Sequence, residues 1–282
     1  MTTEHIKKIA AELKVNEKQV QACIELLDEG ATVPFISRYR KEATGSLDDA
    51  AVTTVRDRLG QLRELDKRRE AVLRSLEEMG KLTEGLKAKV LSAETLTVLE
   101  DIYLPYRPKR RTRATIAKEK GLESLAQRIF AQDPSLDPIA EAAAYINAEK
   151  EVATADDALA GARDIIAEMV SEDPVARGRM RELFATKGIF RSKVIMGKEE
   201  EGIKYKDYYA WEEPVATAPS HRILAMRRGE NEGFLFMRII GPEADALAVL
   251  ESLFLKGAGP ATEQVRLAIH SQRNMKSIAI DI

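Results

Sequence analysis

The 282-residue sequence is poor in cysteine and histidine. The one cysteine, Cys23, permits no internal disulfide, and the first residues lack the apolar core of a secretion signal, so we expect a cytoplasmic location. The three histidines, His5, His221 and His270, lie far apart in the sequence. Because no local ligand pattern is present, we expect neither a metal nor a cofactor.

Long apolar runs and an excess charge are also missing. No stretch approaches the roughly 20 consecutive apolar residues that cross a bilayer, so we expect no membrane partner. Lys and Arg total 44 against 46 Asp and Glu, a net charge of -2, so any affinity for nucleic acid must come from a local patch. Apolar residues make up 44% and charged residues 32% of the chain, which is typical of a globular protein with a sizeable core.

Catalytic signatures are absent as well. The sequence contains no Walker-type phosphate loop, dinucleotide-binding fingerprint, zinc-protease motif or nucleophile elbow. The paired acids Asp48-Asp49 and Asp156-Asp157 lie at expected helix starts, where the helix dipole favours carboxylates, so we interpret them as caps. We therefore predict that the protein is not an enzyme and has no small-molecule substrate.

The first half of the chain has the periodicity of helices. Apolar residues recur every three to four positions in residues 3–13 and again after Asn16, which forms a predicted capping box with Gln19. From Ser46 to Gly80 the pattern predicts one long helix of about 50 Å, which would act as a strut. Its charge run Lys67–Arg69 is interpreted as a solvated face, with nucleic-acid contact as the alternative.

Further helices are expected downstream, near residues 83–92, 95–103, 114–131, 138–148 and 174–186. Residues 189–196 and 203–209 predict a β-hairpin, and residues 233–240 a buried strand. The predicted fold class is mainly α: a multi-helix array with one long strut helix and a small β element near residues 189–240. At roughly 100 to 200 residues per domain we expect two domains, 1–132 and 133–282.

One basic loop stands out from the rest of the chain. Pro105 and Pro108 keep it extended, and its candidate phosphate-binding residues are Arg107, Lys109, Arg110, Arg111 and Arg113. Residues 101–120 carry a net charge of +5, whereas residues 121–180 carry -7. The arginines therefore either face solvent and bind phosphates, or form an internal salt-bridge seam with the acidic helices of residues 121–180.

A second basic run occupies residues 29–45. Its cations are a weaker candidate group for nucleic-acid contact, namely Arg38, Arg40 and Lys41. Phe35, Ile36 and Tyr39 are expected to point inward. We therefore favour a structural corner in which the arginines bridge neighbouring helix ends, with a contact site as the alternative.

Four segments are distinctive. They read LLDEGATVPFISRYRKEATGSLD, LRELDKRREAVLRSLEEMGKLT, ETLTVLEDIYLPYRPKRRTRATIAKEKGLESLA and PSHRILAMRRGENEGFL. These segments resemble the amino-terminal region of the Tex family, bacterial transcription accessory proteins related to a eukaryotic transcription elongation factor. The likeness extends over nearly everything from about residue 5 to residue 269. It implies a helical platform with a helix-turn-helix-like element.

Complete members of the family continue with an RNase H-like domain, helix-hairpin-helix elements and an oligonucleotide-binding-fold domain to which most RNA affinity is ascribed. The tail HSQRNMKSIAIDI departs from the family pattern, so we expect a truncated product or a fragment. Because the family's RNase H-like domain is not considered an active nuclease, the resemblance offers no catalytic residues.

Together these observations predict a non-catalytic, RNA-binding transcription accessory protein, of which this chain is the amino-terminal scaffold. The expected partners are RNA or DNA, bound through phosphates, and RNA polymerase. The alternative is a protein interaction module that docks RNA polymerase or the missing downstream domains without touching nucleic acid. No base-reading pattern distinguishes RNA from DNA.

Overall fold

A computed structural model describes residues 2–107 and 111–271. Contacts divide the chain into two compact units, residues 1–106 and 107–282, which are called the first and second unit below. The boundary predicted after residue 132 falls within the second unit, where one core contains residues from both sides of it, among them Ile129 and Ala142. That residues 1–132 and 133–282 fold as two independent domains stays a prediction.

The first unit is entirely helical over its described residues. Its elements are α1 (Thr2–Leu13), α2 (Glu17–Asp28), α3 (Val33–Tyr39), α4 (Lys41–Thr44), α5 (Asp49–Glu78), α6 (Glu84–Ser92), α7 (Leu96–Tyr103) and the 3₁₀ turn η1 (Leu104–Tyr106). The predicted capping box of Asn16 and Gln19 is confirmed at the start of α2. Cys23 lies on the buried face of this helix, and burial raises the pKa of its thiol to about 11.

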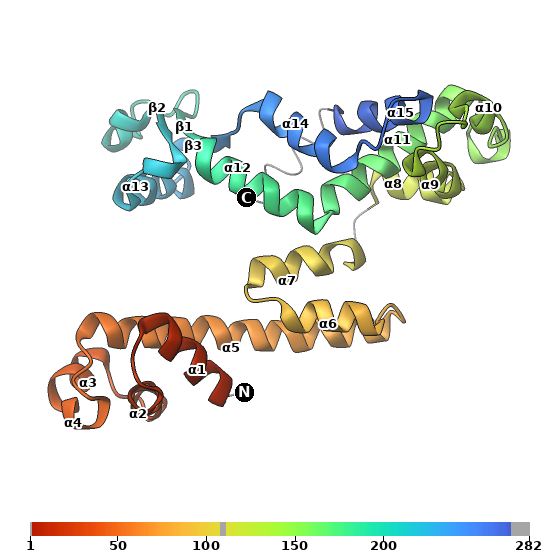
Figure 1. Cartoon of the computed structure of the whole chain (residues 1–282). Coiled ribbons are helices and arrows are strands. Elements are labelled where there is room, and N and C mark those ends of the chain that lie inside the picture. The colour runs from red at the N-terminus through yellow and green to blue at the C-terminus, as the bar shows by residue number, and fades with distance from the viewer. Residues whose placement is uncertain (1, 108–110, 272–282) are drawn as a thin grey trace. The chain divides into compact units, whose positions relative to one another are not determined.

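The 30-residue helix α5 confirms the predicted strut and serves two hydrophobic cores in turn. Its first half, from Val52 to Leu62, packs against α1, α2 and α3. Its second half, from Leu65 to Leu76, packs against α6 and α7 (Figure 1). At 1.5 Å per residue α5 is about 45 Å long, so the two cores lie one after the other along one helix.

Polar side chains fill the gap between these two cores. Asp66 Oδ2 lies 2.8 Å from His5 Nε2 of α1, and Asp66 also pairs with Arg69. Arg69 in turn donates to the backbone oxygens of Val90 (3.2 Å) and Ala93 (2.8 Å), at the end of α6. This cluster therefore ties α1 and α6 to the middle of α5.

Most helices of the second unit surround one large core, whereas α13 (Ser220–Asn231) lies beside the small sheet (Figure 1). The other helices are α8 (Arg113–Glu119), α9 (Glu123–Ala131), α10 (Pro138–Ala143), α11 (Ala155–Glu172), α12 (Pro174–Lys187), α14 (Glu243–Phe254) and α15 (Pro260–Ile269), with 3₁₀ turns η2 (Ala148–Lys150), η3 (Ile203–Tyr208) and η4 (Val215–Thr217). The single helix predicted over residues 114–131 is wrong, because Gly121 has a φ of +86° and ends α8 there. The other predicted starts, at Asp137-Pro138 and Asp173-Pro174, are confirmed as capped helix starts.

A three-stranded antiparallel sheet lies at one end of the second unit, with the order β2-β1-β3. The strands are β1 (Ile189–Val194), β2 (Ala210–Pro214) and β3 (Leu235–Ile240). Ile189 pairs with Pro214 on one side and with Ile240 on the other. Trp211 of β2 is half-buried, and the Arg222 guanidinium lies 5.3 Å from the centre of its ring.

Two expectations about this sheet were wrong. The segment 203–209 is not the second hairpin strand, because residues 203–208 form η3 and bury Tyr205 with its ring 6.1 Å from that of Phe234. The aromatic residues that resembled a strand thus serve packing. The strand near residues 233–240 exists, but β3 is an edge strand whose Phe236 is exposed, not a buried one.

The protein is mainly α with one long helix and one small antiparallel sheet, as predicted. The helix-turn-helix-like element stays a prediction. Within residues 2–107 and 111–271, no helix is both long and apolar enough to cross a bilayer.

Candidate nucleic-acid interface

The basic loop runs from η1 to the start of α8. Arg107, Arg111 and Arg113 are described and exposed, whereas Lys109 and Arg110 lie outside the described residues. The downstream end of the loop lies at Thr112, directly before α8.

A threonine anchors that end. Thr112 caps α8: its Oγ1 accepts from the backbone N–H of Thr115 at 3.0 Å and donates to Glu168 Oε1 of α11 at 3.0 Å. Glu168 also holds Lys118, with Oε2 3.0 Å from Nζ. This carboxylate is mostly buried, so the start of α8 is fastened to α11 from two sides.

A salt-bridge seam is present beside the loop, but lysines form it. Besides the Lys118–Glu168 pair, Lys120 Nζ donates to the backbone oxygen of Glu151 at 3.0 Å and lies 3.4 Å from its Oε2. Both pairs hold α8 to acidic segments within residues 121–180, although the seam interpretation had assigned these contacts to the loop arginines.

The described arginines contribute little to that seam. Arg111 Nη2 lies 2.9 Å from Glu119 Oε2, and both side chains are exposed, at 69% and 53%, so this surface pair is weak. Within the described parts of the chain, neither Arg107 nor Arg113 has a carboxylate partner.

Arg113 also lies at a hollow of about 240 Å³ between α8, α11 and the turn before α11. Lys120 lines this hollow too, but so do three acids, namely Glu151, Asp157 and Asp164. Because carboxylates outnumber cations there, the hollow does not suit a phosphate. A polyanion would instead meet the arginines on the open surface of the loop.

The second basic run differs from its prediction. Phe35 and Tyr39 were expected to point inward with Ile36, yet Phe35 is 43% and Tyr39 70% exposed, and only Ile36 is buried. The reason is the helical phase of the seven-residue α3: Ile36 and Ser37 face α5, where Ser37 Oγ donates to Asp49, and positions 35 and 39 lie one turn apart on the other side.

The cations of this run are mostly unpaired. Arg38 and Lys41 are exposed and have no acid partner among the described residues. Arg40 Nε lies 3.3 Å from Glu42 Oε1 within the same run, although the N–H does not point at that oxygen. The predicted corner, in which these arginines bridge neighbouring helix ends, is therefore wrong.

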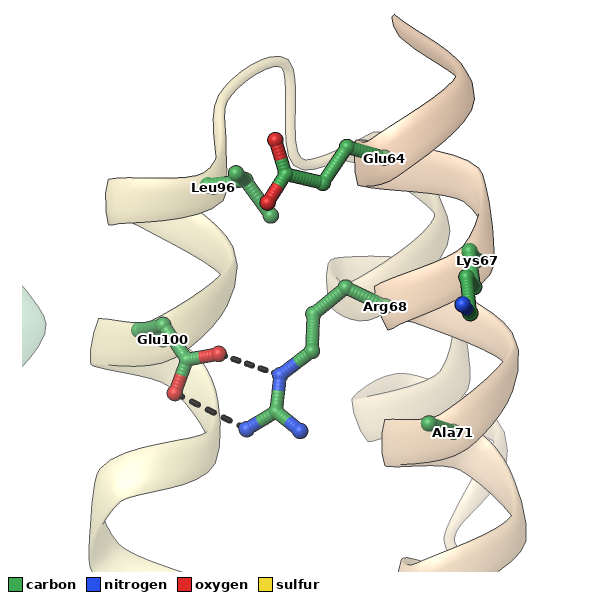
Figure 2. Close-up of a pocket in the computed structure, with 6 residues that line it drawn as sticks. All are labelled: Glu64, Lys67, Arg68, Ala71, Leu96 and Glu100. Atoms are coloured by element: carbon green, nitrogen blue, oxygen red, sulfur yellow. Dashed lines mark hydrogen bonds and ion pairs between the residues drawn. The ribbon is translucent and has the colours of Figure 1, made fainter. Parts of the chain in front are cut away.

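A larger hollow of about 520 Å³ lies between α5 and α7 of the first unit. Figure 2 shows Arg68 of α5 reaching across it to Glu100 of α7, with two contacts that include Nη2 to Oε2 at 3.1 Å. This hydrogen-bonded pair raises the pKa of the Arg68 guanidinium. The predicted solvated face of Lys67–Arg69 is thus wrong for two members, since Arg68 braces α7 and Arg69 braces α6.

The paired acids that could have suggested catalysis lie at helix starts, as predicted. Asp48 accepts from the backbone N–H of Ala51, and Asp157 forms a capping box with Thr154 at the start of α11, so the capping interpretation is confirmed for these two. Asp49 instead accepts from Ser37 Oγ, and a capping role of Asp156 stays a prediction.

Two protein-family models match this chain. The Tex central region-like family matches residues 133–274, and the Tex-like protein N-terminal domain matches residues 3–77. The chain belongs to the Tex family. The resemblance inferred from the four sequence segments is therefore confirmed.

Known Tex proteins share high identity with this chain. "Protein tex" of Bordetella pertussis is 51% identical over 85% of the chain, and "Transcriptional accessory protein Tex" of Neisseria gonorrhoeae is 48% identical over 80% of it. The human "S1 RNA-binding domain-containing protein 1" is 27% identical over 77% of the chain. The chain spans only 30% of the length of each of the two bacterial proteins and 22% of the human one.

Proposed function

We propose that this chain is a non-catalytic, nucleic-acid-binding part of a transcription accessory protein, and that the basic loop contacts phosphates. The observation that carries the proposal is how the cations around α8 are paired: Lys118 binds the mostly buried Glu168 and Lys120 the exposed Glu151, whereas Arg107 and Arg113 have no described carboxylate partner. The names of two relatives, which mention transcription and RNA binding, support the same role.

The chemistry of the loop suits a phosphate backbone. A guanidinium group presents a planar fork of donors that matches phosphate oxygens, and its pKa keeps it charged at every physiological pH. Pro105 and Pro108 each fix a backbone φ angle, so the free loop has fewer conformations and loses less entropy on binding. Lys109 and Arg110, between the described arginines in the sequence, belong to the same proposed set, and Arg38, Arg40 and Lys41 form a second set.

The test measures binding of a fluorescent 20-nucleotide RNA, and of DNA of the same sequence, by anisotropy between 50 and 200 mM salt. The loop variant carries Arg107→Gln, Arg111→Gln and Arg113→Gln. Since each lost phosphate contact removes about 0.7 from the slope of log affinity against log salt for single strands, we expect a slope smaller by about 2. The control carries Lys81→Gln, Lys87→Gln and Lys89→Gln, which remove three exposed cations near and on α6.

Equal affinity and salt slope for the loop variant and the unaltered chain would overturn the phosphate role of the loop. If the unaltered chain binds neither RNA nor DNA at 50 mM salt, the proposal as a whole fails. A pulldown of RNA polymerase subunits would then support the protein interaction module.

The absence of catalysis and the cytoplasmic location are parts of the same proposal. The placement of the paired acids at helix starts supports the absence of catalysis. The buried Cys23, which forms no disulfide, supports the cytoplasmic location. Incubation of labelled RNA and DNA with the chain and Mg²⁺ should leave both intact. Cleavage that a point substitution in the chain removes would contradict this part.

A further inference from the structure

The exposed face of α3 carries two aromatic rings side by side. Phe35 and Tyr39 are one helical turn apart, with ring centroids separated by 5.8 Å and ring planes tilted by 38°. Among the described residues, only Phe236 is another aromatic side chain of comparable exposure. Two neighbouring exposed rings form an apolar patch, and exposed apolar patches rimmed by polar residues are often binding sites.

Cations accompany the rings in the sequence. Arg38, Arg40 and Lys41 follow Phe35 within six residues, and Arg38 and Lys41 are exposed with no acid partner among the described residues. Arg38 follows Phe35 by three positions and therefore lies on the same face as the two rings. This charge is complementary to a polyanion and unfavourable for a basic or purely apolar partner.

The face is also held rigidly. Ile36 is fully buried below it, and Ser37 Oγ donates both to Asp49 and to the backbone oxygen of Val33 (3.1 Å). Gln19 Nε2 lies 3.1 Å from the backbone oxygens of Thr44 and Gly45, which fixes the end of α4. A ligand would thus meet rings whose helix is already positioned, which lowers the cost of binding.

Aromatic rings beside unpaired cations are the arrangement that binds single-stranded nucleic acid. Bases of a single strand expose their faces and stack on aromatic side chains, while nearby cations contact the phosphates. In a duplex these faces are covered by neighbouring bases, so exposed rings on a helix gain little from it.

We propose that the α3–α4 face, comprising Phe35, Arg38, Tyr39 and Lys41, is a stacking platform for single-stranded nucleic acid. The two rings stack on neighbouring unpaired bases, and the two cations contact the flanking phosphates. This inference rests on the proposed function in taking nucleic acid as the ligand. It adds a second contact, on the first unit, and restricts the ligand to unpaired strands.

The test compares the full chain with the double variant Phe35→Ala/Tyr39→Ala. The probes are a 12-nucleotide oligouridine RNA and an RNA duplex of the same length, measured by anisotropy. We expect the affinity for oligouridine to fall by about tenfold or more, because stacking on two bases is lost. The salt slope should stay unchanged, since no charge is removed, and the duplex affinity should not change.

Matched controls separate stacking from general damage. Leu91→Ala/Val98→Ala removes two exposed apolar side chains from α6 and α7 of the same unit and should leave oligouridine binding unchanged. Tyr39→Phe keeps the ring and should also retain binding. Cross-linking of 5-bromouridine RNA to the unaltered chain, mapped by mass spectrometry, should mark Phe35 or Tyr39 directly.

The outcomes for this platform and for the basic loop are distinguishable. If the loop variant loses affinity and Phe35→Ala/Tyr39→Ala binds oligouridine normally, the platform is overturned and the loop stands. If the double variant loses affinity and the loop variant does not, the platform stands and the loop fails. A chain that binds no nucleic acid at all overturns both.

Discussion

The two cation-rich segments of this chain present their charges differently. In the basic loop, arginines follow closely spaced prolines, and the lysines next to them pair with Glu168 and Glu151. On the α3–α4 face, the cations accompany two exposed aromatic rings on a helix that is packed from below. The difference teaches that charge count alone does not describe a candidate nucleic-acid site, since the side chains beside the cations decide which contacts we propose: phosphates alone at the loop, and phosphates with stacked bases on the α3–α4 face.

The largest expected effect concerns the support below the α3–α4 face. Ile36→Ala leaves a cavity between α3 and α5, and we expect the free energy of unfolding of the first unit to fall by about 2–5 kcal/mol. Amide hydrogen exchange of residues 33–44 would become faster, and oligouridine binding would weaken with it. The change should leave exchange in the second unit as it is, and unchanged exchange in residues 33–44 would contradict the packing described.

The next effect concerns the anchor of the basic loop. Glu168→Ala removes the acceptor of Thr112 and the partner of Lys118, and we expect a loss of about 1–3 kcal/mol in the stability of the second unit. Hydrogen exchange at residues 112–119 should accelerate most. If exchange there stays as slow as in the unaltered chain, Glu168 is not the anchor.

A smaller effect, a gain in RNA affinity, is expected at Glu119, the acid that pairs with Arg111 of the basic loop. Glu119→Gln frees Arg111 from its exposed ion pair and removes a negative charge. RNA affinity at 50 mM salt should rise by about 1.4- to 5-fold, the range that corresponds to a surface pair. A fall in affinity in the same anisotropy assay would show that Arg111 does not face the ligand.

The smallest effect tests a paired arginine of the first unit. The hydrogen bond from Arg63 lowers the pKa of Asp28 in the folded protein. The pair therefore stabilises the fold above the pKa of an unfolded Asp, about 4, and this stabilisation is lost as the pH falls through the lowered pKa of the folded state. Asp28→Asn should cost less than about 1 kcal/mol at pH 7, because both side chains are exposed. Urea unfolding at pH 7 and below pH 3 should differ less in this variant than in the unaltered chain.

The sequence predicts well what depends on local periodicity and capping. The apolar stripe from Val52 to Leu76 predicts α5, and Asn16 with Gln19 predicts the start of α2, because both signals act within a few residues. Strand pairing was harder, since β1 lies beside β2 and β3 through contacts that span up to 51 positions, from Ile189 to Ile240. The aromatic segment 203–208 resembled a strand only because its tertiary packing on Phe234 is invisible in the sequence.

For the candidate site, the sequence shows which residue types are present but not where their side chains point. The family and the cation clusters followed from the sequence, but whether Phe35 and Tyr39 faced inward depended on the phase of a seven-residue helix. Spacing gave no warning, because positions 35, 36 and 39 span only about 100° of a helix and could share one buried face. Only the structure shows that Ile36 and Ser37 face α5 instead. Likewise, only distances reveal that Lys118 and Lys120, not the described arginines, pair with Glu168 and Glu151.

The placement of Cys23 and Trp211 has a practical consequence. They are the only cysteine and the only tryptophan of the chain, and one lies in each unit. A thiol reagent would therefore report on the opening of the first unit, and intrinsic indole emission on the second, without any engineered label. Two native reporters in one polypeptide allow the melting of each half to be followed separately in a single sample.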